Sequence, residues 1–183
     1  MKARIAIVAG AGSGIGHATA LALHAAGLTV VAVDRTEAGL KELPDGIHRE
    51  VADATDPAVP GPLVEHVVAE IGAPDVLVNT IGAYELGDAL TVTPQTLGRM
   101  MDVNLGAALW LTQAVARHMK LAGSGVIVHV AAPARRRTDG RRRCLWREQG
   151  RAGAPDAHPR RRATPARDPG QYRRPAAHRH GEE

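Results

Sequence analysis

A glycine-rich segment, GAGSGIG, occupies residues 10–16 and follows a short apolar run. Its glycines fit the spacing G-x-x-x-G-x-G through Gly10, Gly14 and Gly16, because Ile15 stands where the commoner G-x-G-x-x-G spacing has its last glycine. Such glycines allow a tight turn and a close approach of the backbone to a pyrophosphate, which the N-terminus of the following helix stabilises. The segment predicts dinucleotide binding, and a flexible Gly/Ser turn is the alternative interpretation.

An acidic residue, Asp34, ends the next apolar run. A carboxylate there can accept hydrogen bonds from the adenosine ribose hydroxyls and repels a 2′-phosphate, so it favours NAD over NADP. Arg35 follows directly and could pair with a 2′-phosphate, so NADP remains possible. Asp34 could also be an ordinary polar cap of a strand.

The elements that would position these residues alternate in type along the chain. Apolar, β-branched runs predict strands, and segments of helical periodicity separate them. Strands that are apolar throughout and alternate with helices are typical of a parallel sheet covered on both faces. The predicted fold class is therefore α/β, with a doubly wound, Rossmann-type sheet. We expect strands at 3–9, 29–33, 47–52, 76–78 and 126–130, and helices at 15–26, 37–43, 64–71 and 94–121.

Three further segments come after the third and fourth expected strands and inside the long helix. They are residues 51–56 (VADATD), 79–82 (NTIG) and 102–105 (DVNL). With the glycine loop, in this order and spacing, they resemble the short-chain dehydrogenase/reductase family over about residues 1–132. NTIG resembles the family's Asn-Asn-Ala-Gly motif, with Thr80 for the second Asn and Ile81 for the Ala.

The resemblance implies an oxidoreductase that transfers a hydride between the nicotinamide of NAD or NADP and a small-molecule carbonyl or alcohol substrate. It gives Asp53 a contact with the adenine edge and makes Asn104 the catalytic asparagine. It implies no metal. The cofactor-binding residues expected from it are Gly10, Ser13, Gly14, Ile15, Gly16, Asp34, Arg35, Asp53, Ala54, Asn79, Ile81 and Gly82.

The rest of the family's catalytic set is missing. Its reaction needs a Tyr that moves the proton and a Lys that lowers the pKa of that Tyr, since a phenol with a pKa near 10 is a poor base at neutral pH. Neither Tyr84 nor Tyr172 has a Lys four residues further on. The family's Ser-Ser after the fifth strand corresponds to Ala131 and Ala132. Turnover by this chain is therefore expected to be lost or very low.

A change of composition near Pro133 divides the chain. Residues 1–132 carry 8 Lys+Arg and 13 Asp+Glu, a net charge of −5, whereas residues 133–183 carry 15 and 6, a net of +9. The second segment has few large apolar side chains, so it cannot repay the entropy of ordering. We expect a Rossmann-type domain at 1–132, C-terminally incomplete, and a disordered Arg/Pro/Ala-rich tail at 133–183.

We interpret this tail as the product of a shifted reading frame, and a genuine basic tail is the alternative. Leu145 occupies the position of the family's Tyr, within CLWREQG. Suitable codons for that segment, read one nucleotide later, give Ala-Tyr-Gly-Ala-Ser-Lys. The Gly is forced by Trp146 before Arg147, and Gln149 before Gly150 permits only Lys or Arg. Residues 167–175 can likewise be recoded to Glu-Ile-Arg-Val-Asn-Thr-Val-Ala-Pro, which resembles the family's sixth strand. A natural shift and a sequencing error both fit this interpretation.

Two other interpretations stay open. The chain could be a dinucleotide-binding pseudoenzyme or sensor without turnover, or its arginine runs could bind nucleic acid through charge alone, which we do not favour. The single Cys144 and the lack of an apolar run of membrane-spanning length favour a reducing, cytoplasmic location. The family forms homo-oligomers, and we expect that interface to be damaged here.

Overall fold

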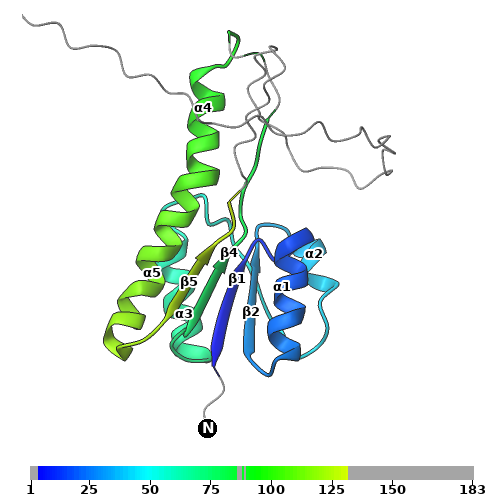
Figure 1. The fold of residues 1–183 in the computed structure, drawn as a ribbon, viewed down its shortest axis with the longest axis vertical. Coiled ribbons are helices and arrows are strands. Elements are labelled where there is room, and N and C mark those ends of the chain that lie inside the picture. The colour runs from blue at the N-terminus through cyan, green and yellow to red at the C-terminus, as the bar shows by residue number, and fades with distance from the viewer. Residues whose placement is uncertain (1–3, 86–87, 89, 132–183) are drawn as a thin grey trace, which may run out of the picture. The chain divides into compact units, whose positions relative to one another are not determined.

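The structure, a computed structural model, describes residues 4–85, 88 and 90–131 (Figure 1). The proposed tail, with Cys144, Leu145 and Tyr172, lies outside these residues. Five parallel strands form one sheet in the order β3-β2-β1-β4-β5. They are β1 (Ile5–Ala9), β2 (Thr29–Asp34), β3 (His48–Val51), β4 (Val76–Asn79) and β5 (Val126–His129).

Helices cover both faces of the sheet. They are α1 (Gly14–Ala25), α2 (Glu37–Lys41), α3 (Pro60–Glu70), α4 (Pro94–Met101) and α5 (Ala107–Ala122). The side chains of β1 alternate between two cores: Ile7 packs with Val64 and Leu111 of α3 and α5, whereas Val8 packs with Leu40 of α2. The predicted doubly wound α/β fold is confirmed. No helix in this part of the chain is both long and apolar enough to cross a membrane.

The long helix expected at 94–121 contains a turn that its periodicity did not predict. Residues Asp102–Gly106 form a π-helical turn, η1, between α4 and α5, in which the N–H of Ala107 donates to the carbonyl of Asp102. The side-chain amide of Asn104 donates to the carbonyl of Met100 at 2.9 Å. In a regular α-helix the backbone N–H of Asn104 would donate to this same carbonyl. The side-chain amide supplies a hydrogen bond to it instead, so the wider turn loses less hydrogen bonding.

One face of β5 carries exposed apolar side chains. Val126 and Val128 of β5 and Val130 just after it are 48%, 44% and 41% exposed, whereas Ile127, on the opposite face, packs against the core. Among the described residues β5 pairs only with β4, so its other edge also presents unpaired backbone groups. Exposed apolar edge strands promote association between chains.

Val128→Lys is therefore expected to reduce association of the full chain. A lysine on an edge strand disfavours pairing with a second chain. Light scattering coupled to size-exclusion chromatography should show a lower mean mass than for the parent. Leu121→Lys, which adds the same charge at an isolated side chain that is 86% exposed, should leave the mass unchanged. The same mean mass for both variants would show that the β5 face does not drive association.

Candidate functional site

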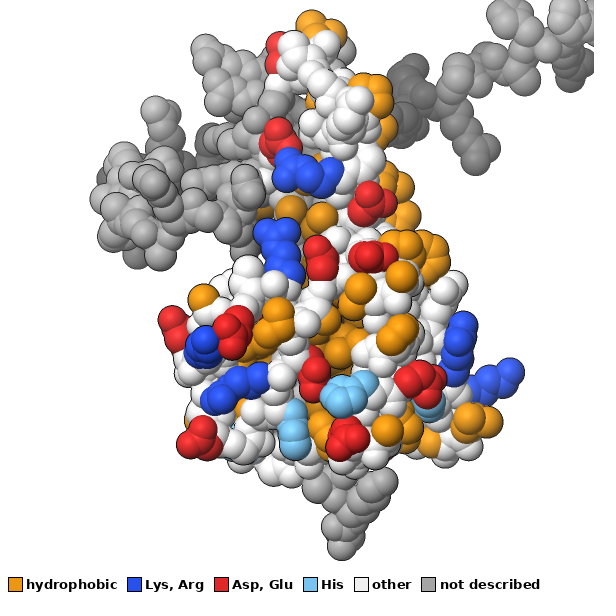
Figure 2. All heavy atoms as spheres, turned by 180° about the vertical axis from the view of Figure 1, so that it is seen from behind, with side chains coloured by type: hydrophobic (Ala, Val, Ile, Leu, Met, Phe, Trp, Pro, Cys, Tyr) orange, Lys and Arg blue, Asp and Glu red, His pale blue; other side chains and the backbone are white. Residues whose placement is uncertain are grey.

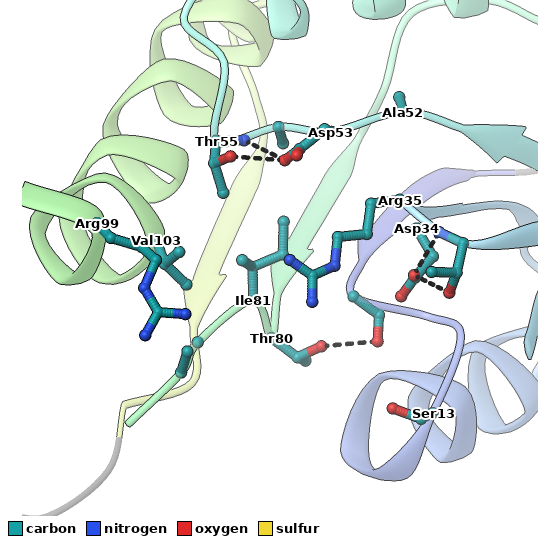
Figure 3. Close-up of a pocket in the computed structure, with 15 residues that line it drawn as sticks. Ser13, Asp34, Arg35, Ala52, Asp53, Thr55, Thr80, Ile81, Arg99 and Val103 are labelled. Atoms are coloured by element: carbon teal, nitrogen blue, oxygen red, sulfur yellow. Dashed lines mark hydrogen bonds between the residues drawn. The ribbon is translucent and has the colours of Figure 1, made fainter. Parts of the chain in front are cut away.

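A cavity of about 470 Å³ lies at the carboxyl ends of the strands (Figure 3). Such a position is where open α/β sheets bind ligands. Of the predicted cofactor residues, the cavity brings together Gly10, Ser13, Asp34, Arg35, Asp53, Ala54, Ile81 and Gly82. It is not lined by Gly14, Ile15, Gly16, Asn79 or Asn104. Its other lining residues are Thr36, Ala52, Thr55, Thr80, Ala83, Arg99 and Val103.

The glycine loop is held by the end of β2. The N–H groups of Gly10 and Ala11 both donate to the carbonyl of Val33, at 2.9 and 3.0 Å, and the N–H of Gly12 donates to Asp34 Oδ2 at 3.0 Å. Gly10 has φ +81°, which L side chains rarely adopt. The first half of the loop thus uses its own donors to fix its shape.

Gly12 was not predicted as a site residue, yet the structure gives it a specific reason to be glycine. A Cβ on Gly12 would lie 2.7 Å from the carboxyl carbon of Asp34. On the other side, a Cβ on Gly39 of α2 would lie 1.8 Å from the carbonyl oxygen of Gly12. The only sequence signal was the G-x-G pair of Gly10 and Gly12, which the chosen spacing set aside.

The second half of the loop leaves its donors open. Ser13 is the N-cap of α1 but makes no side-chain capping hydrogen bond, and the first turn carries no acidic side chain. The amides of residues 14–16 therefore have no cap among the described residues, and the positive end of the helix dipole has no counter-charge there. A Cβ on Gly14 would meet no atom within 4 Å, so the surface beside it is open. This arrangement suits an anion.

The carboxylate of Asp34 lies between the glycine loop and the start of α2. Its Oδ1 accepts from the N–H and the hydroxyl of Thr36, at 3.0 and 2.9 Å, and its Oδ2 accepts from Gly12. The side chain of Arg35 extends across the cavity toward Ile81 (Figure 3). An acidic and a basic group thus stand together at one end of the cavity.

Asp53 faces the cavity from the loop after β3. Its Oδ1 accepts from the hydroxyl of Thr55 at 2.7 Å and from the N–H of Thr55 at 3.0 Å. These hydrogen bonds, with a smaller contribution from the positive charge of Arg35, lower the pKa of Asp53 below its ordinary value. The group is ionised at neutral pH, so it can only accept hydrogen bonds from a ligand. Ala54 beside it is buried.

Asn79 is buried and does not line the cavity. It is 3% exposed, and its Oδ1 accepts from the N–H of Ile81 at 3.0 Å. Its amide nitrogen lies 3.3 Å from Nδ1 of His129 on β5. The side chain of Asn79 therefore shapes the loop that carries Ile81. It also connects the end of β4 to β5.

The side chain of Asn104 also forms hydrogen bonds with backbone groups. Its Oδ1 accepts from the N–H of Ala83 at 3.1 Å, and its Nδ2 donates to the carbonyls of Ala83 and Met100, both at 2.9 Å. Ala83 lines the cavity, so the hydrogen bonds of Asn104 connect one cavity wall to the long helix.

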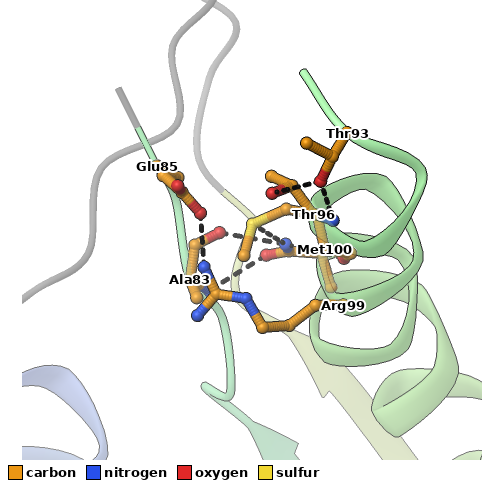
Figure 4. Close-up of polar contacts among 7 residues, drawn as sticks. Ala83, Glu85, Thr93, Thr96, Arg99 and Met100 are labelled. Carbon is orange, nitrogen blue, oxygen red and sulfur yellow. Dashed lines mark hydrogen bonds and ion pairs between the residues drawn. The ribbon is translucent and has the colours of Figure 1, made fainter. Parts of the chain in front are cut away.

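Arg99 is a cavity residue that the sequence reasoning missed. It projects from α4 and forms an ion pair with Glu85, which follows the same wall (Figure 4). A signal existed, because Arg99 is the only Lys or Arg between Arg49 and Arg117. Neither its partner nor its direction could be obtained from the sequence, since both depend on how the loop after β4 meets α4.

Comparisons with known proteins agree with this architecture. The sequence model of a family described as short chain dehydrogenase matches residues 4–138. L-xylulose reductase of Mesocricetus auratus is 38% identical over 141 residues, which cover 75% of this chain and 56% of that protein. D-threitol dehydrogenase of Mycolicibacterium smegmatis is 35% identical over 141 residues, covering 73% and 54%.

A solved short-chain dehydrogenase from Streptomyces avermitilis superimposes with a TM-score of 0.68 at 32% identity, over 72% of this chain and 50% of that one. The chain thus spans about half the length of the relatives it matches. A family match over residues 4–138 takes in every element of the sheet. The chain belongs to the short-chain dehydrogenase family.

Proposed function

We propose that this chain binds the adenosine and pyrophosphate parts of NAD(P), and that it derives from an oxidoreductase acting on carbonyl or alcohol groups. The observation that carries the proposal is the uncapped N-terminus of α1, which adjoins the cavity that Asp34 and Asp53 line. Amide donors suit a pyrophosphate, and carboxylate acceptors suit ribose hydroxyls and an adenine amine. When bound, the cofactor would supply or accept a hydride.

The substrate of the parent enzyme belongs to the proposal as well. The named relatives act on L-xylulose and D-threitol. Small ketoses and polyols are therefore the first compounds to test, and cytoplasmic location and a damaged homo-oligomer interface remain expectations. Leu97, Met101 and Leu105 lie at four-residue intervals on the long helix and are 49%, 49% and 56% exposed, a pattern that favours packing against another chain.

The alternative function is a non-catalytic dinucleotide sensor, which the absence of Tyr-x-x-x-Lys favours. A nucleic-acid role has less support in the described part of the chain. On the face seen in Figure 2, Lys and Arg are interspersed with Asp and Glu and form no basic stripe.

Isothermal titration calorimetry of the full chain tests the cofactor proposal. We expect binding of NAD, and binding of ADP with an affinity within a few-fold, because the residues assigned above serve the adenosine and pyrophosphate parts, both of which ADP contains. No heat with either ligand at millimolar concentration, from protein that shows a cooperative thermal transition, would refute it. A strong preference for NAD over ADP would instead reveal a nicotinamide site.

Asp34→Ala is expected to narrow the preference for NAD over NADP by about tenfold, because it removes a charge that repels a 2′-phosphate. Arg35→Ala is the matched variant and should shift the ratio the opposite way. Affinities for both cofactors, measured side by side by calorimetry, give the ratio. An unchanged ratio in Asp34→Ala would remove that residue from the ribose assignment.

A further inference from the structure

The hydroxyl of Thr80 contacts the glycine loop from β4's carboxyl end. It donates to the carbonyl of Ala9 at 2.8 Å and approaches the carbonyl of Gly10 at 3.3 Å. The backbone N–H of Thr80 also donates to Ala9, at 2.9 Å. Figure 3 shows the hydroxyl directed toward this loop. The side chain thus reaches the two residues at which β1 turns into the loop.

The Gly10 carbonyl, which the Thr80 hydroxyl approaches, also packs against the first turn of α1. A Cβ on Gly16 would lie 2.0 Å from the oxygen of Gly10 and 2.6 Å from the hydroxyl of Thr80. Gly16, the Gly10 carbonyl and the Thr80 hydroxyl are therefore packed in direct contact. The same peptide unit is held on its other side by the N–H of Ala11, which donates to the carbonyl of Val33 of β2 at 3.0 Å.

This arrangement links Thr80 to the donors at the start of α1. If the Gly10 carbonyl rotates, the first turn of α1 loses the surface against which Gly16 packs. The amides of residues 14–16 lie in that turn and are the donors available to an anion. Of the adenosine-side groups, Asp53 is held by Thr55, and Asp34 is held by Thr36 and by the N–H of Gly12, none of which hydrogen-bonds to Thr80.

We propose that Thr80 is a positioning residue for the phosphate groups of the ligand, an inference that rests on the proposed function. Its hydroxyl donates to the Ala9 carbonyl and packs against the Gly10 carbonyl and Gly16, and so holds the end of β1 and the first turn of α1 in register. It lines the cavity, but it acts through the loop. Removing the hydroxyl should lower the affinity for phosphate-bearing ligands and leave the affinity for adenosine unchanged.

The test compares the full chain with Thr80→Val, which has nearly the same shape without the hydroxyl, and Thr80→Ser, which keeps it. ADP and adenosine are titrated separately, with NMR amide shifts as the readout. We expect Thr80→Val to bind ADP about tenfold more weakly and adenosine as the parent does. Thr80→Ser should bind ADP within about twofold of the parent, because serine keeps the hydroxyl. Serine lacks the methyl group of threonine, so side-chain volume would not explain this result.

Each other result has a definite meaning. Unchanged ADP affinity in Thr80→Val, or an equal loss for ADP and adenosine, would overturn the positioning role. If the parent binds neither ADP nor NAD, the proposed function itself fails. If Thr80→Val does not fold, Thr80→Ala removes the same hydroxyl without adding a methyl group against Gly16, and the same comparison is made with it.

Discussion

Restoring the reading frame upstream of Cys144 is expected to turn an inactive chain into an oxidoreductase, with turnover raised at least about a thousandfold, as for recovery of a general acid–base pair. Without Tyr-x-x-x-Lys, no phenol with a lowered pKa can pass the proton. The many arginines of residues 133–183 stay charged at all accessible pH and cannot replace it. Ala132, in place of the family's Ser, would still limit the rate.

The repair consists of deleting one nucleotide between codons 133 and 143, which should recover the motif and the sixth strand together. The repaired protein is assayed with NAD(H) and NADP(H) against a panel of ketoses, polyols and simple alcohols. A synonymously recoded gene in the original frame is the control and should stay inactive. A second control replaces the recovered Tyr with Phe and should lose the gain.

Three findings would contradict this account. Genomic DNA whose shifted frame meets an immediate stop, or encodes no Tyr-x-x-x-Lys, would leave the basic tail to be explained by selection. A repaired protein that folds and binds NAD but turns over nothing would favour the sensor. Activity of the unrepaired chain would show that other residues carry the proton.

The strand pattern and the glycine loop could be predicted because they depend on neighbours in sequence. The apolar run of β1 is buried at every residue, as its lack of alternation required. Gly10, Gly14 and Gly16 could be singled out by spacing, and the positive φ of Gly10 and Gly14 accords with their type.

Other parts of the site depend on contacts between distant segments. Asn79 and Asn104 could be named by motif, but the sequence does not say that both amides bind backbone groups of the loop after β4. The π-helical turn could not be predicted, because the amphipathic pattern continues through it. The contact of Thr80 with Gly10 joins residues 70 positions apart.

Gly16→Ala is expected to lower the free energy of unfolding by about 3 kcal/mol or more, and to abolish cofactor binding, because overpacking against a fixed backbone cannot be relieved by a rotamer change. The added Cβ would lie 2.0 Å from the oxygen of Gly10, which Thr80 and β2 hold in place. Urea denaturation followed by circular dichroism measures the change, and an unchanged m-value shows that the unfolded state is not responsible.

Two glycines of the same chain make the comparison specific to packing. Gly98→Ala, in the middle of α4 with no atom within 4 Å of its Cβ, should raise the unfolding free energy by about 0.5–1 kcal/mol through helix propensity. Gly14→Ala also has open space but φ +53°, so it should cost about 1–2 kcal/mol through backbone strain alone. If Gly16→Ala cost no more than Gly14→Ala, α1 would not rest on the Gly10 carbonyl. The positioning role of Thr80 would then lose its structural basis, since Thr80 acts on α1 through the packing of its hydroxyl and the Gly10 carbonyl against Gly16.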